Sequence, residues 1–310
     1  MIRAFAAAGT DVSHIVPVDL KKALWIDVTD PTGDEIRRIS DELKIPLDDI
    51  LDSLDPDERP RFEDEDDYFL LMYRMPMVEG QRSGVYITAP VGFFVRKKKL
   101  VTVHTNKVDL VSYFSQRKRR REIKSSHEIL VAILGTNVRR LDIFLRQVQQ
   151  KLTAFRSTIV RSMKEEAAQE AYQLSNDLIF FDASIFGNLN ALTQMLRHRT
   201  KGFSKALMER LEDIEIDTKQ QHDTAYMYRE MLSTTLEAYQ SSISNNLNLV
   251  LKILASISLI LMLPTLIASL YGMNVGLPLE NNPYAFWIIA VISAGWAGFL
   301  IFLFRRLDWL

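Results

Sequence analysis

The residues of this 310-residue chain that are best suited to chemistry are neutral oxygen groups near its C-terminal end. Hydroxyl and amide side chains that share one helix face can line an aqueous path for a solute. They can equally bond back to their own helix or hold neighbouring helices together, and the sequence leaves both interpretations open. Six such side chains fall on one broad face of a predicted helix: Ser244, Asn248, Ser258, Thr265, Ser269 and Asn274.

The segment that carries these residues is almost free of charge. Only four of the 77 charged side chains lie in the last 58 residues, although the chain as a whole is close to neutral at −1. Two stretches, 249–271 and 283–304, are long and apolar enough to cross a bilayer as helices. A buried soluble hairpin is the alternative, and two such runs in succession argue against it.

Basic residues predict how the two stretches are oriented. Lys252 lies at the start of the first, and Arg305 and Arg306 open the tail 305–310, whereas the loop 272–282 contains neither Lys nor Arg. The positive-inside rule therefore predicts cytoplasmic N- and C-termini and an outer loop. The N-terminus lacks the long apolar region of a secretory signal. We therefore expect a multi-pass protein of the cell (plasma or inner) membrane. Two helices cannot enclose an aqueous path, so a pore would need several copies of the chain.

Residues 1–120 are predicted to form a cytoplasmic α/β domain. Arg96 to Lys99 is predicted to be a hairpin turn, and the acidic run from Glu63 to Asp67 a solvated loop. Asp30 is the predicted N-cap of a helix whose apolar face recurs through 35–44. The β-rich runs are 23–28, 68–73, 91–95 and 100–104.

Residues 121–248 show the spacing of long helices instead. Apolar residues alternate steps of four and three from Leu134 to Ile159, and again from Leu174 to Met195, which predicts two antiparallel helices that pack through heptad seams. From Ser204 there is neither Pro nor Gly until Pro264, so one helix should run from this stalk directly into the first membrane stretch.

Several function classes find no support in the residues. The chain has no cysteine, its five histidines lack metal-ligand spacing, and no Gly-rich phosphate loop follows a strand. We find no nucleophile and base that could form an active site, so we expect neither an enzyme nor an organic cofactor. The basic block Arg117 to Arg121 has no interleaved aromatic residues, and a solvated helix end is favoured over nucleic-acid binding.

The motif Tyr271-Gly272-Met273-Asn274 lies at the outer end of the first membrane stretch, with a second stretch and the basic-aromatic end Arg305 to Leu310 after it. In this position, behind a charged α/β and long-helix region, it resembles the CorA-type divalent metal ion transporters. The resemblance spans the whole chain. It implies an α+β cytoplasmic domain, with an α/β sheet plus long helices, followed by two C-terminal transmembrane helices, in a homopentameric funnel-shaped channel.

The resemblance also implies roles for residues of the first membrane helix. Gly272, Met273 and Asn274 would form the selectivity filter, where neutral amides accept hydrogen bonds from the waters of hydrated Mg²⁺. Met262 and Leu254 would be hydrophobic constrictions that gate by dewetting. Glu237 stands where the family has Asp, Ser269 replaces a common glycine, and Pro264 is one residue from the usual proline. The implied pore-lining set is Ser269, Thr265, Met262, Ser258, Leu254, Asn248 and Glu237.

Acidic residues are implied as a cytoplasmic Mg²⁺ sensor that holds the channel shut when internal Mg²⁺ is high. Asp213 is the implied ligand, and Glu79 is its candidate partner. Glu280, the acid of the outer loop, would attract cations to the entrance, although a simple solvated role is equally compatible. Three further acids leave the ligand assignment open: Glu212, Glu215 and Asp217.

Three functions remain in competition. The favoured one is passive influx of Mg²⁺, with Co²⁺ and Ni²⁺ as further cargo, through a homopentamer in membrane lipid and with no nucleic-acid partner. The second is Zn²⁺ transport of the related ZntB type. The third is a non-conducting sensor anchored in the membrane, which would leave the polar helix face and the Gly272-Met273-Asn274 motif unexplained.

Overall fold

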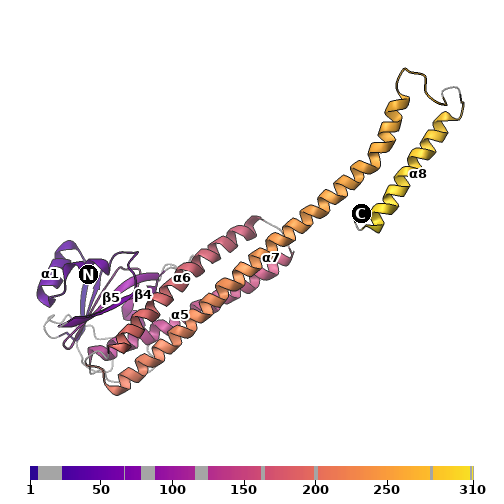
Figure 1. The fold of residues 1–310 in the computed structure, drawn as a ribbon. Helices are drawn as coiled ribbons and strands as arrows, with labels where there is room; N and C mark the ends of the chain where they lie inside the picture. The colour runs from indigo at the N-terminus through magenta and orange to yellow at the C-terminus, as the bar shows by residue number, and fades with distance from the viewer. Residues whose placement is uncertain are drawn as a thin grey trace. The chain divides into compact units, whose positions relative to one another are not determined.

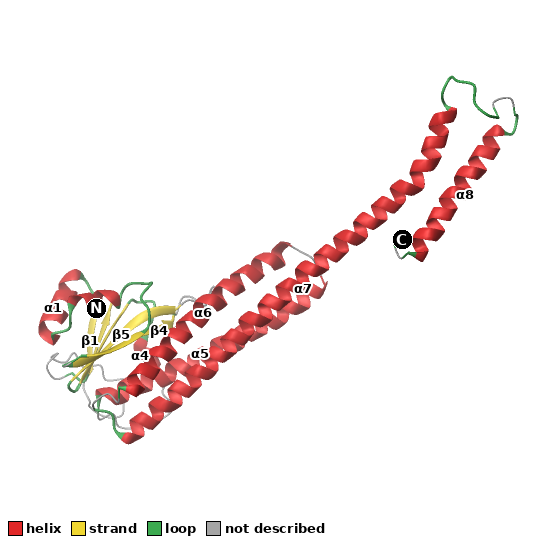
Figure 2. Cartoon of the chain, viewed as in Figure 1, coloured by secondary structure: helices red, strands yellow, loops and turns green. Residues whose placement is uncertain are grey.

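The computed structural model describes residues 1–5, 23–65, 67–77, 88–115, 125–161, 165–198, 202–279, 282–307 and 309. These residues form two compact units, Met1–Thr234 and Thr235–Leu310. Figure 2 shows that strands occur only in the N-terminal part of the drawn chain and that helices make up the rest. The strands are β1 (Ile2–Phe5), β2 (Trp25–Thr29), β3 (Arg61–Asp64), β4 (Tyr68–Pro76), β5 (Thr88–Arg96) and β6 (Lys99–His104).

The helices differ greatly in length. The two shortest described helices, Leu47–Asp52 and Leu110–Ser115, have six residues each, whereas the helix Lys205–Tyr271 continues without a break for 67 residues and belongs to both units. The helices are α1 (Gly33–Leu43), α2 (Leu47–Asp52), α4 (Leu110–Ser115), α5 (Ser126–Arg161), α6 (Glu165–Arg197), α7 (Lys205–Tyr271) and α8 (Ala285–Arg306) (Figure 1).

The six strands form one mixed sheet in the order β1-β2-β6-β5-β4-β3. The pair β2 and β6 is parallel, and the other neighbours are antiparallel. Alternate side chains of β4 point to opposite faces: Leu70 and Met72 belong to the core under α1, and Leu71 and Tyr73 to the core under α5. Both faces are buried, which explains why these strands read as continuous apolar runs.

The predicted strands are confirmed, and so is the turn between β5 and β6, where Lys97 adopts a positive φ of 53°. Both edge strands of the sheet, β1 and β3, were not predicted from the sequence. The prediction of a solvated loop for the acidic run was wrong at Glu63 and Asp64, because these two residues belong to β3 and pair with β4. The predicted N-cap was also wrong: Thr32 rather than Asp30 caps α1, in a capping box with Glu35.

The heptad seams are confirmed over the described side chains. In α5 the seam is buried from Leu134 to Phe155, and in α6 all seven predicted positions from Leu174 to Met195 are buried. These two helices and the first part of α7 lie side by side (Figure 1). The predicted unbroken helix after Ser204 is confirmed as α7. The fold class predicted from the sequence is therefore correct.

A buried ionic network joins β1, β2 and β6. The Asp27 carboxylate accepts hydrogen bonds from Arg3 (2.6 Å), Thr102 (2.8 Å) and the Nε2 of His104 (2.9 Å). Nδ1 of His104 lies 2.8 Å from the carbonyl oxygen of Thr105, so both ring nitrogens of this buried side chain face oxygen atoms. Burial alone would raise the pKa of Asp27, but the bonds from His104 and Thr102 and the nearby positive charges lower it.

Asp27→Asn should lower the free energy of unfolding by about 3–5 kcal/mol at pH 7, because His104 and Arg3 lose a buried anionic partner. Thermal unfolding of the full chain in detergent measures the change. The contribution of Asp27 should be complete above the pKa of the unfolded carboxyl, about 3.9, and be lost as the pH falls through the lower value of the folded state.

Asp41→Asn provides the control, because Asp41 is an exposed carboxyl on α1. Equal unfolding temperatures for Asp27→Asn and the wild type at pH 7 would contradict the stabilising role of the network.

Candidate functional site

The motif Gly272-Met273-Asn274 begins where α7 ends. The amide of Gly272 donates to the carbonyl oxygens of Ala268 (3.0 Å) and Ser269 (3.2 Å), and the amide of Met273 donates to that of Leu270 (3.2 Å). Met273 and the Asn274 side chain are exposed in the single chain. Gly272 does not have a positive φ, so its backbone conformation does not require glycine. The motif thus presents amide and carbonyl oxygens outward at a helix C-terminus.

The loop after the motif is tied back to the helix. The hydroxyl group of Tyr271 donates to the carbonyl oxygen of Pro278 at 3.0 Å, which closes the loop on its own helix. Tyr271 therefore holds the loop. Glu280, the predicted outer-loop acid, lies outside the described residues.

The predicted polar face of α7 is exposed along its length in the isolated chain. The hydroxyl groups of Ser258 and Thr265 donate to the carbonyl oxygens of Leu254 (2.9 Å) and Leu261 (2.7 Å), one turn earlier. Back-bonding to the helix, one of the two interpretations left open, therefore does occur. It does not exclude the other, because each hydroxyl oxygen keeps lone pairs that can accept hydrogen bonds from water.

The predicted constrictions lie on the same face. Met262 is 65% exposed and Leu254 is 60% exposed in the single chain. At 100° per residue, the positions from Glu237 to Ser269 in the predicted pore set fall within an arc of about 120°. Glu237 and Asn248 are exposed as well. The structure therefore presents one continuous stripe, which alternates neutral oxygens with apolar side chains.

Acids gather on α7 within the first unit. Burial raises the pKa of Asp217, and so do the negative charges of Asp142 and Asp213. Asp142 comes from α5 and was not predicted, because only the fold brings it to α7. Glu215 is already engaged, since the hydroxyl group of Thr193 donates to it at 2.7 Å. The structure thus brings Asp213 and Asp217 together with Asp142.

Neither the acids nor the histidines form a complete metal site within the described chain. No group of three or more His, Asp and Glu side chains there has the geometry to hold an ion. His104 and His222 pair with Asp27 and Asp182, and His14 lies outside the described residues, as does Glu79, the predicted partner of Asp213. A sensor built from one chain alone would therefore be incomplete in these residues.

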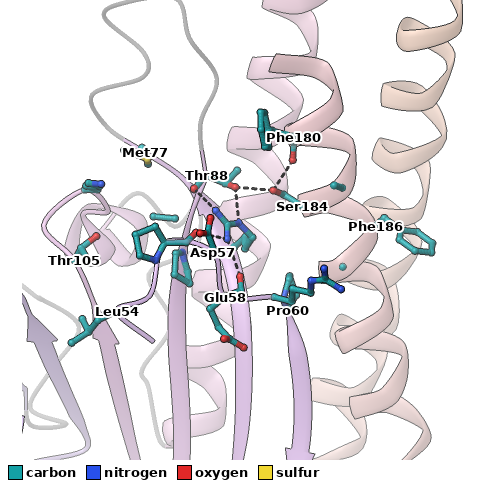
Figure 3. Close-up of a pocket in the computed structure, with 18 of the residues that line it drawn as sticks. Leu54, Asp57, Glu58, Pro60, Met77, Thr88, Thr105, Phe180, Ser184 and Phe186 are labelled. Atoms are coloured by element: carbon teal, nitrogen blue, oxygen red, sulfur yellow. Dashed lines mark hydrogen bonds between the residues drawn. The ribbon is translucent and has the colours of Figure 1, made fainter. Parts of the chain in front are cut away.

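A pocket of about 910 Å³ lies between the 54–60 loop, the ends of β4 and β5, and α6 (Figure 3). Arg74 shapes its wall by donating to the carbonyl oxygens of Pro56 and Glu58, both at 2.8 Å. It also donates to the hydroxyl group of Thr88, which lies 2.7 Å from that of Ser184. Its guanidinium is thus occupied by the protein itself, and the pocket contains none of the predicted site residues.

Comparison with known proteins agrees with this arrangement. The family model for the CorA-like Mg²⁺ transporter protein matches residues 21–306. The chain belongs to the CorA family. The match includes all of α7 and α8, so the exposed stripe and the motif after it are parts of a CorA-type chain.

Several CorA relatives match along almost the whole length. The cobalt/magnesium transport protein CorA of Methanocaldococcus jannaschii is 26% identical over 295 residues, which cover 93% of this chain and 92% of the relative. That of Thermotoga maritima is 23% identical over 320 residues and covers 97% and 88%. The complete structure of the Methanocaldococcus jannaschii CorA magnesium transporter superposes with a TM-score of 0.83, at 26% identity, over 95% of this chain and 94% of that one.

More distant structures share the fold alone. The full-length CmaX protein superposes with a TM-score of 0.76 at 16% identity, over 99% of this chain and 97% of that one. The ZntB cytoplasmic domain of Vibrio parahaemolyticus reaches a TM-score of 0.57 at 15% identity, over 71% and 88%. The resemblance to CorA seen in the sequence is confirmed, and the zinc-transporting alternative has less support.

Tyr271→Phe should reduce cation flux by about two- to fivefold, because the loss of one hydrogen bond, about 1 kcal/mol, loosens the loop that follows the motif. Flux into proteoliposomes measures the effect. Tyr284→Phe is the matched control, since the Tyr284 side chain is exposed next to the same loop. Full flux in Tyr271→Phe would show that the bond to Pro278 does not order the site.

Proposed function

We propose that this chain is a passive Mg²⁺ transporter of CorA type, which mediates influx and also carries Co²⁺ and Ni²⁺. Five copies would surround the pore, with α7 of each copy lining it and α8 outside. The membrane potential supplies about 2.3 kcal/mol per charge per 100 mV, and so about twice that for a divalent ion. No energy-consuming active site is then required.

The observation that carries the proposal is the exposed stripe of α7, followed directly by the motif Gly272-Met273-Asn274, in a chain that the CorA family model matches over residues 21–306. Mg²⁺ releases its waters reluctantly, and neutral oxygens can bind the hydrated ion without removing them. The chain segment from Asn248 to Asn274 contains one charged residue, Lys252, which is not one of the predicted pore-lining positions. A hydrated divalent cation suits this path better than a bare ion does.

Within the pore, each residue type has a separate task. Gly272, Met273 and Asn274 form the outer filter, in which the asparagine amides accept hydrogen bonds from the ion's waters. Met262 and Leu254 are apolar rings that dewet when the helices approach one another. The remaining rings supply neutral oxygens, and the innermost an acid: Ser269, Thr265, Ser258, Asn248 and Glu237.

We further propose that cytoplasmic Mg²⁺ closes the pore by binding at Asp213, with Glu79 of a neighbouring copy as partner. The raised pKa of Asp217, caused by burial and then by the charges of Asp142 and Asp213, supports an excess of negative charge at this place. A divalent cation would neutralise that charge and hold neighbouring copies together, and its loss would let them separate.

The membrane arrangement follows the charge distribution. The proposed parts are a cytoplasmic α/β domain (1–120), a helical stalk (121–248), membrane spans 249–271 and 283–304, an outer loop 272–282 with Glu280 as a weak cation attractor, and a basic tail 305–310. Within the described ranges of the chain, helices α7 and α8 are long and apolar enough to span a membrane. Both termini would lie in the cytoplasm, at the cell membrane. We assign no catalytic residue, organic cofactor or nucleic-acid partner.

The two competing functions differ in what they transport. A ZntB-type protein would carry Zn²⁺ with a response to an imposed pH gradient, and a non-conducting sensor would carry neither metal. Mg²⁺ and Zn²⁺ uptake into proteoliposomes, with and without a pH gradient, separates all three. Mg²⁺ uptake that is independent of the pH gradient is the expected result.

Asn274→Ala should reduce Mg²⁺ flux by roughly tenfold to a hundredfold, because hydrogen bonds to a charged ligand contribute about 1.5–3 kcal/mol. The matched control is Asn245→Ala, an exposed asparagine on α7 outside the arc of the predicted stripe. Full Mg²⁺ flux in Asn274→Ala would refute the proposed filter.

Asp213→Lys should raise the internal Mg²⁺ concentration needed for half-inhibition by roughly fivefold or more, the lower limit of a typical coupling between sites. Glu230→Lys makes the same charge change at another exposed position of α7 and should leave inhibition unchanged. Wild-type inhibition in Asp213→Lys would remove Asp213 from the sensor without affecting the pore assignment.

A further inference from the structure

The part of α7 in the first unit packs through a heptad seam that two polar residues interrupt. Its buried positions advance by alternate steps of four and three residues, as in a coiled coil. Most of these positions are apolar, but Thr218 is fully buried and Gln221 is 3% exposed. The seam consists of Leu207, Leu211, Ile214, Thr218, Gln221, Ala225, Tyr228 and Leu232.

Gln221 ties α7 to one particular turn of α5. Its Nε2 donates to the backbone carbonyl oxygen of Val138 at 2.7 Å and to the carboxylate of Asp142 at 2.7 Å. An amide group offers two N–H donors, and both are used here. These bonds form only when Gln221 lies opposite this turn.

A second polar group adjoins the first. Tyr73 of β4 and Asn137 of α5 are fully buried, and Thr218 and Asn137 both lie close enough to the Tyr73 hydroxyl group to affect its pKa. Burial raises the pKa of Tyr73 to about 12, and the nearby polar groups of Thr218 and Asn137 oppose that rise. We call Tyr73, Asn137, Thr218 and Gln221 the polar layer. It joins the sheet, α5 and α7 within the interior of the first unit.

Stability alone does not explain the polar layer. Among the described residues, the hydroxyl group of Tyr73 and both amide atoms of Asn137 lack a hydrogen-bond partner of good geometry. Each such group costs about 1–3 kcal/mol when buried, and apolar replacements of buried polar groups are often neutral or stabilising. The polar layer therefore calls for a role in specificity.

Heptad seams provide such a role. A uniformly apolar seam packs almost equally well after a slip of one heptad, which is about 10 Å along the helix. A buried polar residue removes that degeneracy, because the slip leaves its partners unpaired. Gly135 of α5 faces Ile214 of α7, since a Cβ atom on Gly135 would lie in ordinary van der Waals contact with that side chain, at 3.6 Å.

We propose that the polar layer locks the axial register of α7 on α5 and the sheet, with Gln221 as the positioning residue. Since α7 is one helix from Lys205 to Tyr271, the register set at Gln221 is carried by an unbroken backbone to Met262 and Ser269. The lock itself is independent of the proposed function, and only its consequence for the ion path depends on that function.

The test uses the absence of cysteine in the full chain. Spin labels on Gln150→Cys in α5 and Glu209→Cys in α7, both exposed positions, report the axial separation of the helices by electron–electron distance measurement. The wild type should give one narrow distance peak. Gln221→Leu should add a second population shifted by about 10 Å, or at least double the peak width. Gln220→Leu, an exposed glutamine next to it, should match the wild type.

A charge variant tests the same bond independently of folding defects in Gln221→Leu. Gln221→Glu places a carboxylate against Asp142 and should broaden the distance distribution at neutral pH. Gln221→Glu combined with Asp142→Asn restores a donor and an acceptor and should return the narrow peak. A wild-type distribution in Gln221→Leu and Gln221→Glu, or a broad one that Asp142→Asn does not restore, would overturn the register lock.

Discussion

A helix that passes from water into lipid must satisfy its backbone hydrogen bonds within itself, because the hydrocarbon offers no partners. Helix α7 fits this requirement, since it runs for 67 residues with Pro264 as its only proline and no glycine. The same helix can then pack by a heptad seam in the first unit and carry a polar stripe in the second. A flexible linker between the seam and the stripe would not transmit the axial position of one to the other.

The hydration of a divalent cation sets the second constraint. The free energy lost by removing water from Mg²⁺ is large, so a path that keeps the ion hydrated needs acceptors rather than ligands that replace water. A single chain leaves its stripe exposed, and one α7 with one α8 cannot surround water. The proposed ion path therefore requires the assembly, whereas the residues proposed to line it can be named from one chain.

Most of the fold could be predicted from the periodic spacing of apolar residues in the sequence. The strands under both cores and the seams of α5 and α6 could be predicted because burial leaves a regular apolar pattern. The strands β1 and β3 could not, since they are the two edges of the sheet, short and partly charged. Strand β3 consists mainly of charged residues, which are typical of a loop in the sequence. In the structure, Arg61 of this strand pairs with Asp52 and Glu63.

The residues of the candidate site likewise fall into those that could be predicted from the sequence and those that could not. The stripe of α7 could be read from one helix, because its residues lie at helical spacing. Asp142, Tyr73 and Asn137 could not, because their neighbours on α7 are distant in sequence and only the packing of three elements brings them together. The contact between Asp27 and His104 was not predicted for the same reason. Strands β2 and β6 are parallel neighbours in the sheet, but β3, β4 and β5 lie between them in the sequence.

The hydroxyl groups of Ser258 and Thr265 that bond back to their own helix bear on which sign of ion charge the proposed path favours. Each spends its single hydrogen on the helix and so can only accept from whatever lies beside it. A hydrated cation turns the hydrogens of its waters outward and meets these oxygens directly. A hydrated anion turns oxygens outward and finds no donor in them. In the proposed pore, the two side chains would therefore favour hydrated cations over hydrated anions without any charge of their own.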